Sequence, residues 1–293
     1  TGTYYIQLVD GNGCSVVQAV NATVTATPNL VITDPAPVCT PSTVDLTAAA
    51  VTAGSDPGVL SYWTDLAATI PLGTPASVGT GTYYIQLDLG GGCSTVEAVN
   101  AVVNPLPTLT ITDPAAVCSP ATVDLTAAAV TAGSDAGALT YWTDLAATIA
   151  LGAPGAVGTG TYYIQLVDGN GCSVVQAVNA VVNPLPTLTI TDPPAVCTPG
   201  TIDLTAAAVT AGSDAGTLTY WTDLAATIAL GTPNAVGTGT YYIQLVDGNG
   251  CSVVQAVNAV VNPLPTLTIT NPAAVCTPGT VDLTAAAVTA GSD

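Results

Sequence analysis

The chain has 293 residues, of which 19 are Asp or Glu and none is Lys, Arg or His, so its formal net charge is -19. Without cationic side chains it has no phosphate clamp, no basic patch for nucleic acid or anionic lipid, and no lysine or histidine for catalysis. The apolar content of 49% suffices for hydrophobic cores, and no apolar run approaches the roughly 18 residues of a membrane-spanning helix. We therefore expect a folded, non-enzymatic protein with no nucleic-acid partner and no membrane insertion.

A tandem repeat organises the chain. The sequence Gly-Thr-Tyr-Tyr-Ile-Gln-Leu begins at Gly2, Gly81, Gly160 and Gly239, so the period is 79 residues. Asn-Pro-Leu-Pro stands between units, and its prolines favour an extended backbone that leaves a sheet ladder. These boundaries predict three complete domains between a partial repeat that holds a closing hairpin and another that holds opening strands: residues 1–26, 27–104, 105–183, 184–262 and 263–293.

Each complete unit is predicted to be all-β. Apolar residues alternate with a period of two, and β-branched and aromatic residues lie between clusters of Gly, Pro, Asp and Ser. In the third complete unit, taken in chain order, the predicted strands are Thr187–Thr191, Thr201–Thr210, Thr217–Asp223, a weaker pair near Ala226–Leu230 and Ala235–Gly237, Thr240–Val246 and Cys251–Val261. The Ala-rich run within Thr201–Thr210 has threonines at its ends and no helix cap, so we assign it to a strand.

A hairpin is predicted to close each unit at Asp247–Gly250 and its equivalents. Asn-Gly between two β runs indicates a tight turn with positive φ at both central residues. In the first complete unit the same place reads Leu-Gly-Gly-Gly, which keeps the turn chemistry.

Two aromatic positions indicate the fold. One Trp per complete unit lies on the third main strand, and one Tyr opens the penultimate strand, as in immunoglobulin-like sandwiches. The residues are Trp63, Trp142 and Trp221, and Tyr83, Tyr162 and Tyr241. The predicted fold is a tandem array of Ig-like β-sandwich domains, in which these aromatics fill cores or, alternatively, one Trp or the second Tyr contacts a ligand.

Three motifs resemble those of a known family. They are Gly-Thr-Tyr-Tyr-Ile-Gln-Leu-Val-Asp-Gly-Asn-Gly-Cys, Asn-Pro-Leu-Pro-Thr-Leu-Thr-Ile-Thr and Ala-Val-Cys-Thr-Pro-Gly-Thr-Val-Asp-Leu-Thr-Ala. Together they resemble the Ig-like repeats of very large Bacteroidetes cell-surface proteins, including adhesins associated with gliding motility. The resemblance covers every unit, although members of that family usually contain some Lys and Arg. It implies secretion, attachment or fibre formation at the cell surface, and no catalysis in the repeats.

The cysteines are predicted to form structural disulfides. They lie at Cys14, Cys39, Cys93, Cys118, Cys172, Cys197, Cys251 and Cys276, and their separations alternate between 25 and 54 residues. Zinc sites need thiolates two to four residues apart, and a reactive thiol needs a nearby cation, so neither is expected. Disulfides in turn indicate an extracellular location.

Two connectivities stay open. In the favoured one the bonds lie within a domain, joining Cys39 with Cys93, Cys118 with Cys172, and Cys197 with Cys251, while Cys14 and Cys276 pair outside the complete repeats. In the other, a chain folded about Pro-Leu-Pro brings together the cysteines that flank each linker, such as Cys172 and Cys197.

The acidic residues fit turns and solvated faces better than a site. Asp recurs at the start of one strand and after the Trp strand, but no Asp-x-Asp-x-Asp-Gly loop occurs, so no metal or other cofactor is expected and calcium is the minor alternative. No sequence feature marks the paired carboxylates of a glycosidase.

The predicted function is a stalk or fibre of disulfide-stabilised Ig-like repeats at the cell surface. Its partners would be other copies or further repeats, since the two partial repeats are complementary parts of one domain. Equally, they would arise from an arbitrary window on a longer array. The alternative function is a carbohydrate- or surface-binding module that uses the second tyrosine of each Tyr-Tyr pair: Tyr5, Tyr84, Tyr163 and Tyr242.

Overall fold

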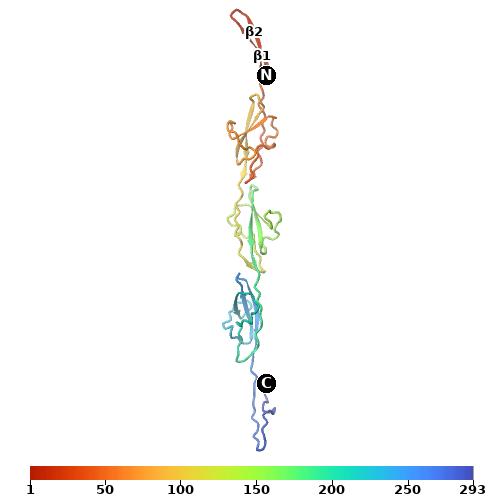
Figure 1. Cartoon of the computed structure of the whole chain (residues 1–293), viewed down its shortest axis with the longest axis vertical. Helices are drawn as coiled ribbons and strands as arrows, with labels where there is room; N and C mark the ends of the chain where they lie inside the picture. Colours follow the sequence, from red (N-terminus) through yellow and green to blue (C-terminus); the bar gives the residue numbers. More distant parts are fainter. Residues whose placement is uncertain (293) are drawn as a thin grey trace. The chain divides into compact units, whose positions relative to one another are not determined.

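In a computed structural model, residues 1–292 are described, and they contain β-strands, turns and extended segments but no helix. No stretch of these residues therefore forms a helix that would reach across a bilayer. The strands, drawn in Figure 1, are β1 (Gly2–Val9), β2 (Ser15–Ala22), β3 (Val38–Cys39), β4 (Val59–Trp63), β5 (Gly81–Asp88), β6 (Ser94–Ala101), β7 (Val103–Asn104), β8 (Val117–Cys118), β9 (Ala138–Trp142), β10 (Gly160–Val167), β11 (Ser173–Ala180), β12 (Val182–Asn183), β13 (Val196–Cys197), β14 (Thr217–Trp221), β15 (Gly239–Val246), β16 (Ser252–Ala259) and β17 (Val261–Asn262).

Each complete repeat carries one three-stranded antiparallel sheet and one short parallel pair. The sheets have the orders β4-β5-β6, β9-β10-β11 and β14-β15-β16, with the Tyr-Tyr strand always in the middle. The parallel pairs are β3 with β7, β8 with β12, and β13 with β17. An isolated antiparallel bridge between Val44 and Val78 adds to the second layer in the first complete repeat.

The core lies between these layers because the central strand alternates. Ile85 and Leu87 on β5 point inward and are fully buried, whereas Gln86 between them is half-buried on the outer face. They belong to one cluster with Leu46 and Val99. Each such side chain stabilises the fold by roughly 1.5–3 kcal/mol through burial, and the third complete repeat has an equivalent cluster around Ile243.

The first tyrosine of the Tyr-Tyr pair anchors the start of the central strand. The Tyr83 hydroxyl donates to the Gly79 carbonyl at 3.3 Å, and the Tyr241 hydroxyl donates to the Gly237 carbonyl at 3.4 Å. A tyrosine in this position, bonded to backbone a few residues upstream, is the tyrosine corner of Ig-like domains. With the two-layer topology and the Trp on the first strand of the sheet, it confirms the predicted tandem Ig-like β-sandwich fold.

Two predicted strands are wrong. Thr201–Thr210 is a series of turns in which only Ile202 makes a bridge, to Val236. Its chain bends because the Asp203 carboxylate accepts hydrogen bonds from the Thr205 backbone N–H (2.8 Å) and hydroxyl (2.6 Å), which compete with ladder pairing. Thr187–Thr191 is extended but belongs to no strand.

The weaker strand pair is reduced to single bridges. Ala229 bridges Trp221, and Val236 bridges Ile202, but neither Ala226–Leu230 nor Ala235–Gly237 forms a strand.

The closing hairpins are confirmed, but their turn type differs from the prediction. Only the final glycine of Asp-Gly-Asn-Gly has positive φ, at 81° for Gly171 and 83° for Gly250, and the preceding Asn does not. The Asp168 carboxylate accepts the backbone N–H groups of Asn170 (2.9 Å) and Cys172 (2.8 Å), which makes a longer turn than the predicted two-residue one.

The chain divides into two compact units whose limits do not follow the repeat. The first comprises Thr1–Asp113, Thr126–Pro154 and Thr161–Val178; the second comprises Pro114–Leu125, Gly155–Gly160 and the described residues from Asn179 onward. The middle complete repeat contributes to both units. The predicted domain boundaries therefore stay a prediction.

Candidate functional site

Two disulfides form the most distinctive covalent feature of the chain. Cys39 is bonded to Cys172, and Cys118 is bonded to Cys251, with a Cα–Cα distance of 5.6 Å and a sequence separation of 133 residues in each case. Each bond joins the opening cysteine of one repeat to the closing cysteine of the following repeat, and each lies within one compact unit. The disulfides therefore connect consecutive repeats.

Both predicted connectivities are wrong for these residues. Cys39 is bonded neither to Cys93 in its own repeat nor to a cysteine across the nearest linker; Cys118 is not bonded to Cys172, and Cys197 is not bonded to Cys251.

Strand register explains the pairing. Cys39 lies on β3 opposite Asn104 of β7, at the end of the repeat where the chain leaves it. Cys93 precedes β6, whose eight residues run about 26 Å toward that end. This length far exceeds the roughly 7 Å that a disulfide tolerates between Cα atoms, so a cysteine from the closing hairpin of the next repeat becomes the partner.

The turn of the closing hairpin holds the partner cysteine in place. The backbone N–H of Cys172 donates to the Asp168 carboxylate, and the same bond of 2.8 Å joins Cys251 to Asp247. Both cysteines are 1% exposed. The Asp-Gly-Asn-Gly-Cys motif is thus a positioning element for the disulfide, a role that the sequence did not reveal.

Four cysteines are free thiols within the described residues. Cys14, Cys197 and Cys276 are exposed, while Cys93 is half-buried with its Sγ 3.7 Å from the Thr25 carbonyl oxygen. The prediction that Cys93 and Cys197 are bonded inside complete repeats is therefore wrong. Cys14 and Cys276 have no disulfide partner among residues 1–292, and their predicted pairing outside the complete repeats stays a prediction.

An aromatic pair occupies the outer face of each three-stranded sheet. Trp63 lies directly opposite Tyr84 in the β4–β5 register, and directly opposed residues share one face. The Trp63 indole N–H donates to the Ser61 hydroxyl at 2.9 Å, and that hydroxyl donates to the Gln86 side-chain oxygen at 3.2 Å. The other complete repeats pair Trp142 with Tyr163 and Trp221 with Tyr242.

This placement decides which tyrosines can serve as a binding surface. Tyr84, Tyr163 and Tyr242 are half-buried beside their Trp, so each presents part of its ring on a face with one polar edge. Tyr5 is exposed, and β1 pairs with β2 alone among the described strands. Whether any of these four residues contacts a ligand remains a prediction.

The recurrent acids build turns. Oδ1 of Asp65 accepts the backbone N–H groups of Thr69 (3.1 Å) and Ile70 (2.7 Å), while Oδ2 accepts the Thr69 hydroxyl (2.7 Å). The Thr69 hydroxyl and then the Ile70 N–H hold the pKa of Asp65 below its ordinary value. Asp144 and Asp223 repeat this arrangement, and there the backbone N–H of the following Ile is the largest cause of the lowered pKa.

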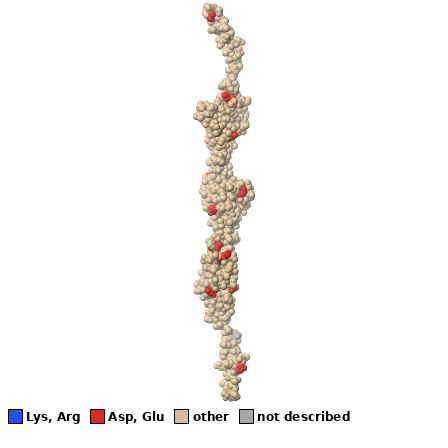
Figure 2. All heavy atoms as spheres, viewed as in Figure 1, with Lys and Arg blue, Asp and Glu red and all other residues tan. Residues whose placement is uncertain are grey.

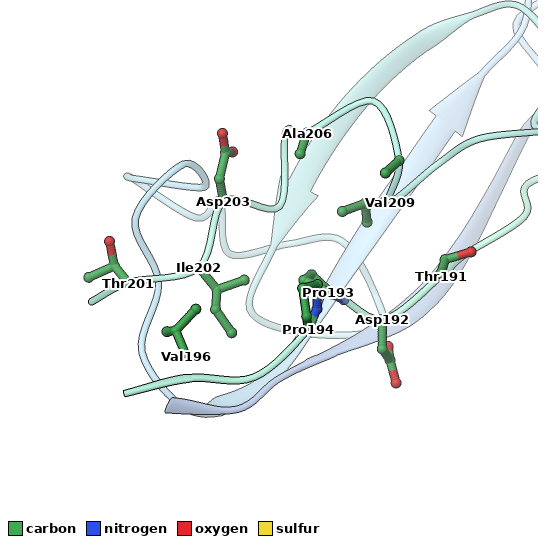
Figure 3. A pocket seen from close by; sticks show the side chains of 11 residues that line it. Thr191, Asp192, Pro193, Pro194, Val196, Thr201, Ile202, Asp203, Ala206 and Val209 are labelled. Atoms are coloured by element: carbon green, nitrogen blue, oxygen red, sulfur yellow. The ribbon is translucent and has the colours of Figure 1, made fainter. Parts of the chain in front are cut away.

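A pocket of about 250 Å³ opens in the third complete repeat (Figure 3). Its lining is largely apolar and includes Val196, Ile202 and Val209. Asp192 and Asp203 stand at its edges with their carboxylates pointing in opposite directions. Asp192 accepts the Asn258 backbone N–H at 2.8 Å, and Asp203 is held by its own turn, so the two do not converge on a reacting group.

The acids also stand apart from one another. Among residues 1–292 no group of three or more Asp, Glu, Cys or His side chains gathers to hold a metal ion. On the face in Figure 2 the acidic side chains lie in small separate spots, with no basic side chain near them. The chemistry that the structure concentrates is sulfur crosslinking, and no general base or nucleophile accompanies it.

Comparison with known proteins yields structural likeness only. No family model matches the chain, and no curated protein matches it. Among solved structures, the chain is similar to the N-terminal eight Ig domains of Down Syndrome Cell Adhesion Molecule, at 13% identity and a TM-score of 0.41, covering 89% of this chain and 40% of that one. Titin domains I67–I69 give 9% identity and a TM-score of 0.40, covering 82% of this chain and all of the titin fragment. Sidekick-1 immunoglobulin domains 1–5 give 13% and 0.24, covering 90% of this chain and 67% of that one.

Proposed function

We propose that the chain is a non-enzymatic extracellular structural and adhesive protein, a stalk or fibre of Ig-like repeats of the kind found in very large Bacteroidetes surface proteins. The observation that carries the proposal is the pair of equivalent disulfides, each joining one repeat to the next. A domain that only had to fold would gain as much from a bond inside itself. A bond between neighbours instead makes the array continuous through sulfur as well as through backbone.

The crosslinks give such an array mechanical and thermodynamic strength. Closing a loop of 133 residues removes conformational freedom from the unfolded chain, which on the chain-entropy account stabilises the folded state by about 5 kcal/mol per bond. Disulfides persist in oxidising compartments, which supports an extracellular location. The absence of Lys and Arg leaves trypsin-like proteases no site to cut, a property suited to exposure outside the cell.

Single-molecule stretching tests this function. In a Cys118→Ser, Cys251→Ser variant only the Cys39–Cys172 bond remains, and it hides 133 residues from the applied force. At about 3.4 Å per residue, the fully unfolded chain should be roughly 450 Å shorter before reduction than after it.

The matched control is a variant in which Cys39 and Cys172 are also changed to Ser. Its extension should not respond to reductant. If the two-Ser variant also failed to lengthen on reduction, the repeats would not be crosslinked and the proposed load-bearing function would be lost.

A second candidate function is binding of carbohydrate through the Trp–Tyr face. It is favoured by the repetition of the same half-buried pair in three repeats. Replacing Tyr84, Tyr163 and Tyr242 together by Ala should then reduce retention on a polysaccharide resin, whereas Tyr5→Ala, which removes a tyrosine with no Trp opposite in the described sheet, should not. Equal retention of all three proteins would remove this candidate.

A further inference from the structure

The first hairpin of the chain is a domain half with its core face uncovered. Strands β1 and β2 pair in the register of β5 and β6, with Ile6 opposite Gln18 as Ile85 is opposite Glu97. Yet Ile6 is 64% exposed, whereas its equivalent Ile85 is 0% exposed. A hollow of about 540 Å³, lined by Ile6, Leu8 and Val20 among others, lies on this face.

The last segment of the chain is the matching half. Leu283 is 68% exposed, whereas its equivalent Leu46 is 1% exposed. The segment nevertheless keeps the backbone arrangement of a complete repeat: Thr270 N–H donates to the Val288 carbonyl at 2.9 Å, as Thr33 N–H donates to that of Val51 at 2.8 Å. Both halves are therefore formed in advance, which lowers the entropic cost of joining them.

Complete repeats show how the halves fit. In the first one, Val44 and Leu46 from the opening segment pack in one cluster with Ile85, Leu87 and Val99 from the closing hairpin. The equivalents are Val281 and Leu283 at one end of the chain, and Ile6, Leu8 and Val20 at the other. We infer that the C-terminal segment of one copy packs on the N-terminal hairpin of a second copy, so that the two form one hybrid repeat.

The disulfide register then assigns every free cysteine. An opening cysteine bonds the closing cysteine of the following repeat. In the hybrid repeat the closing cysteine is Cys14 of the second copy, so it bonds Cys197 of the first copy. Cys276 of the first copy is the opening cysteine of the hybrid and bonds Cys93 of the second copy. All four thiols are used, two bonds to a junction.

Each new bond is an oxidation. Two thiols give one S–S bond, two protons and two electrons, and a small-molecule disulfide takes up both and becomes two thiols. The hybrid repeat contains no counterpart of residues 57–79, which include strand β4. Packing at the junction therefore buries less than a complete core, and the two covalent bonds are what hold it.

Crosslink mapping on the full chain tests the inference, which rests on the repeat-to-repeat register of the proposed function. A Ser15→Thr variant gives the Cys14 peptide its own mass, because its surroundings otherwise match those of Cys172 and Cys251. The variant is mixed with isotope-labelled chain and incubated with oxidised glutathione. We expect species of two or more chains on a non-reducing gel, joined by Cys14–Cys197 and Cys93–Cys276 bonds between labelled and unlabelled chains.

Matched variants separate docking from random oxidation. Ile6→Asp with Leu8→Asp places charges on the core face and should lower the yield of linked chains roughly tenfold or more, because buried charges without partners are costly. Tyr5→Asp with Gln7→Asp makes the same change on the other face and should leave the yield unaltered.

Two outcomes would overturn the inference. One is the absence of linked chains while the Cys39–Cys172 and Cys118–Cys251 bonds are intact, a result that leaves the proposed function standing. The other is a mixture dominated by bonds such as Cys14–Cys14, formed equally by both double-Asp variants.

Discussion

At the scale of residues, carboxylates organise this chain without any cation to pair with. Asp65 has five polar neighbours' worth of demand met by a single loop: its two oxygens take N–H and O–H groups from Thr69 and Ile70. Asp45 does the same for the backbone and hydroxyl of Thr47. These hydrogen bonds favour the ionised form and lower the pKa of both acids.

Stability should therefore fall in acid. The pKa of Asp65, Asp144 and Asp223 is lowered from 3.8 in the folded chain. Their contribution is present above pH 3.8 and is lost as the pH falls through the folded-state pKa. Urea midpoints measured at high salt, which screens repulsion among the acids, should drop over that range.

Variants identify the groups responsible. Changing Asp65, Asp144 and Asp223 to Asn should lower the midpoint at neutral pH and flatten the acid limb of the profile. Glu97→Gln removes an exposed charge from β6 and should leave the profile unchanged. A triple variant with the same acid limb as the natural chain would mean that other groups control it.

Three alanines hold a backbone conformation that suits glycine. Ala68, Ala147 and Ala226 have φ of 51°, 53° and 51° in the same loop that each neighbouring Asp organises. Because the left-handed region is costly for an L-residue, Ala68→Gly should stabilise the first complete repeat by up to about 1 kcal/mol. Ala67→Gly, at a position without positive φ, should instead destabilise it by about 0.4–1 kcal/mol in thermal or urea unfolding.

At the scale of elements, the repeat supplies an internal comparison of the same strand in two environments. The sequence Gly-Thr-Tyr-Tyr-Ile-Gln-Leu is buried on one face as β5 and uncovered on both as β1. Its strand form therefore follows from local pattern and hairpin pairing, whereas the burial of its apolar face depends on the opening segment.

One substitution made in both places measures that difference. Ile85→Ala removes a fully buried side chain and should destabilise its repeat by about 2–5 kcal/mol. Ile6→Ala changes the same residue in the same sequence where it is exposed, and should shift the unfolding of the complete repeats by no more than about 0.5 kcal/mol. Similar losses from both would show that the first hairpin is covered by the chain's own repeats.

Periodicity predicted the strands that pair along their length and missed those segments that do not. Gly239–Val246 and Ser252–Ala259 have alternating apolar residues on both sides of a turn and form the hairpin as expected. Thr201–Thr210 has the same composition, but Asp203 captures its backbone and produces turns. The Tyr corner followed from position alone, whereas the turn type of Asp-Gly-Asn-Gly depended on a side-chain hydrogen bond that the pattern does not encode.

At the scale of the whole chain, the sequence indicated structural cysteines but not their partners. Equal spacing is compatible with any register that advances by a repeat. The choice depends on which end of a repeat each cysteine occupies, and this followed only once Cys39 was placed beside Asn104 and Cys93 beside the closing turn. The Trp–Tyr face was likewise hidden until strand register set Trp63 opposite Tyr84.

Disulfide mapping of the unreduced protein is the most direct test of the central claim that each crosslink joins consecutive repeats. Pepsin is the suitable protease, because trypsin has no site and acid conditions suppress thiol–disulfide exchange. A Ser173→Thr variant distinguishes the Cys172 peptide from that of Cys251. The account predicts that the Cys39 peptide is linked to the marked Gly-Asn-Gly-Cys-Thr sequence; a link from Cys39 to the Gly-Gly-Gly-Cys-Ser-Thr sequence of Cys93 would contradict it.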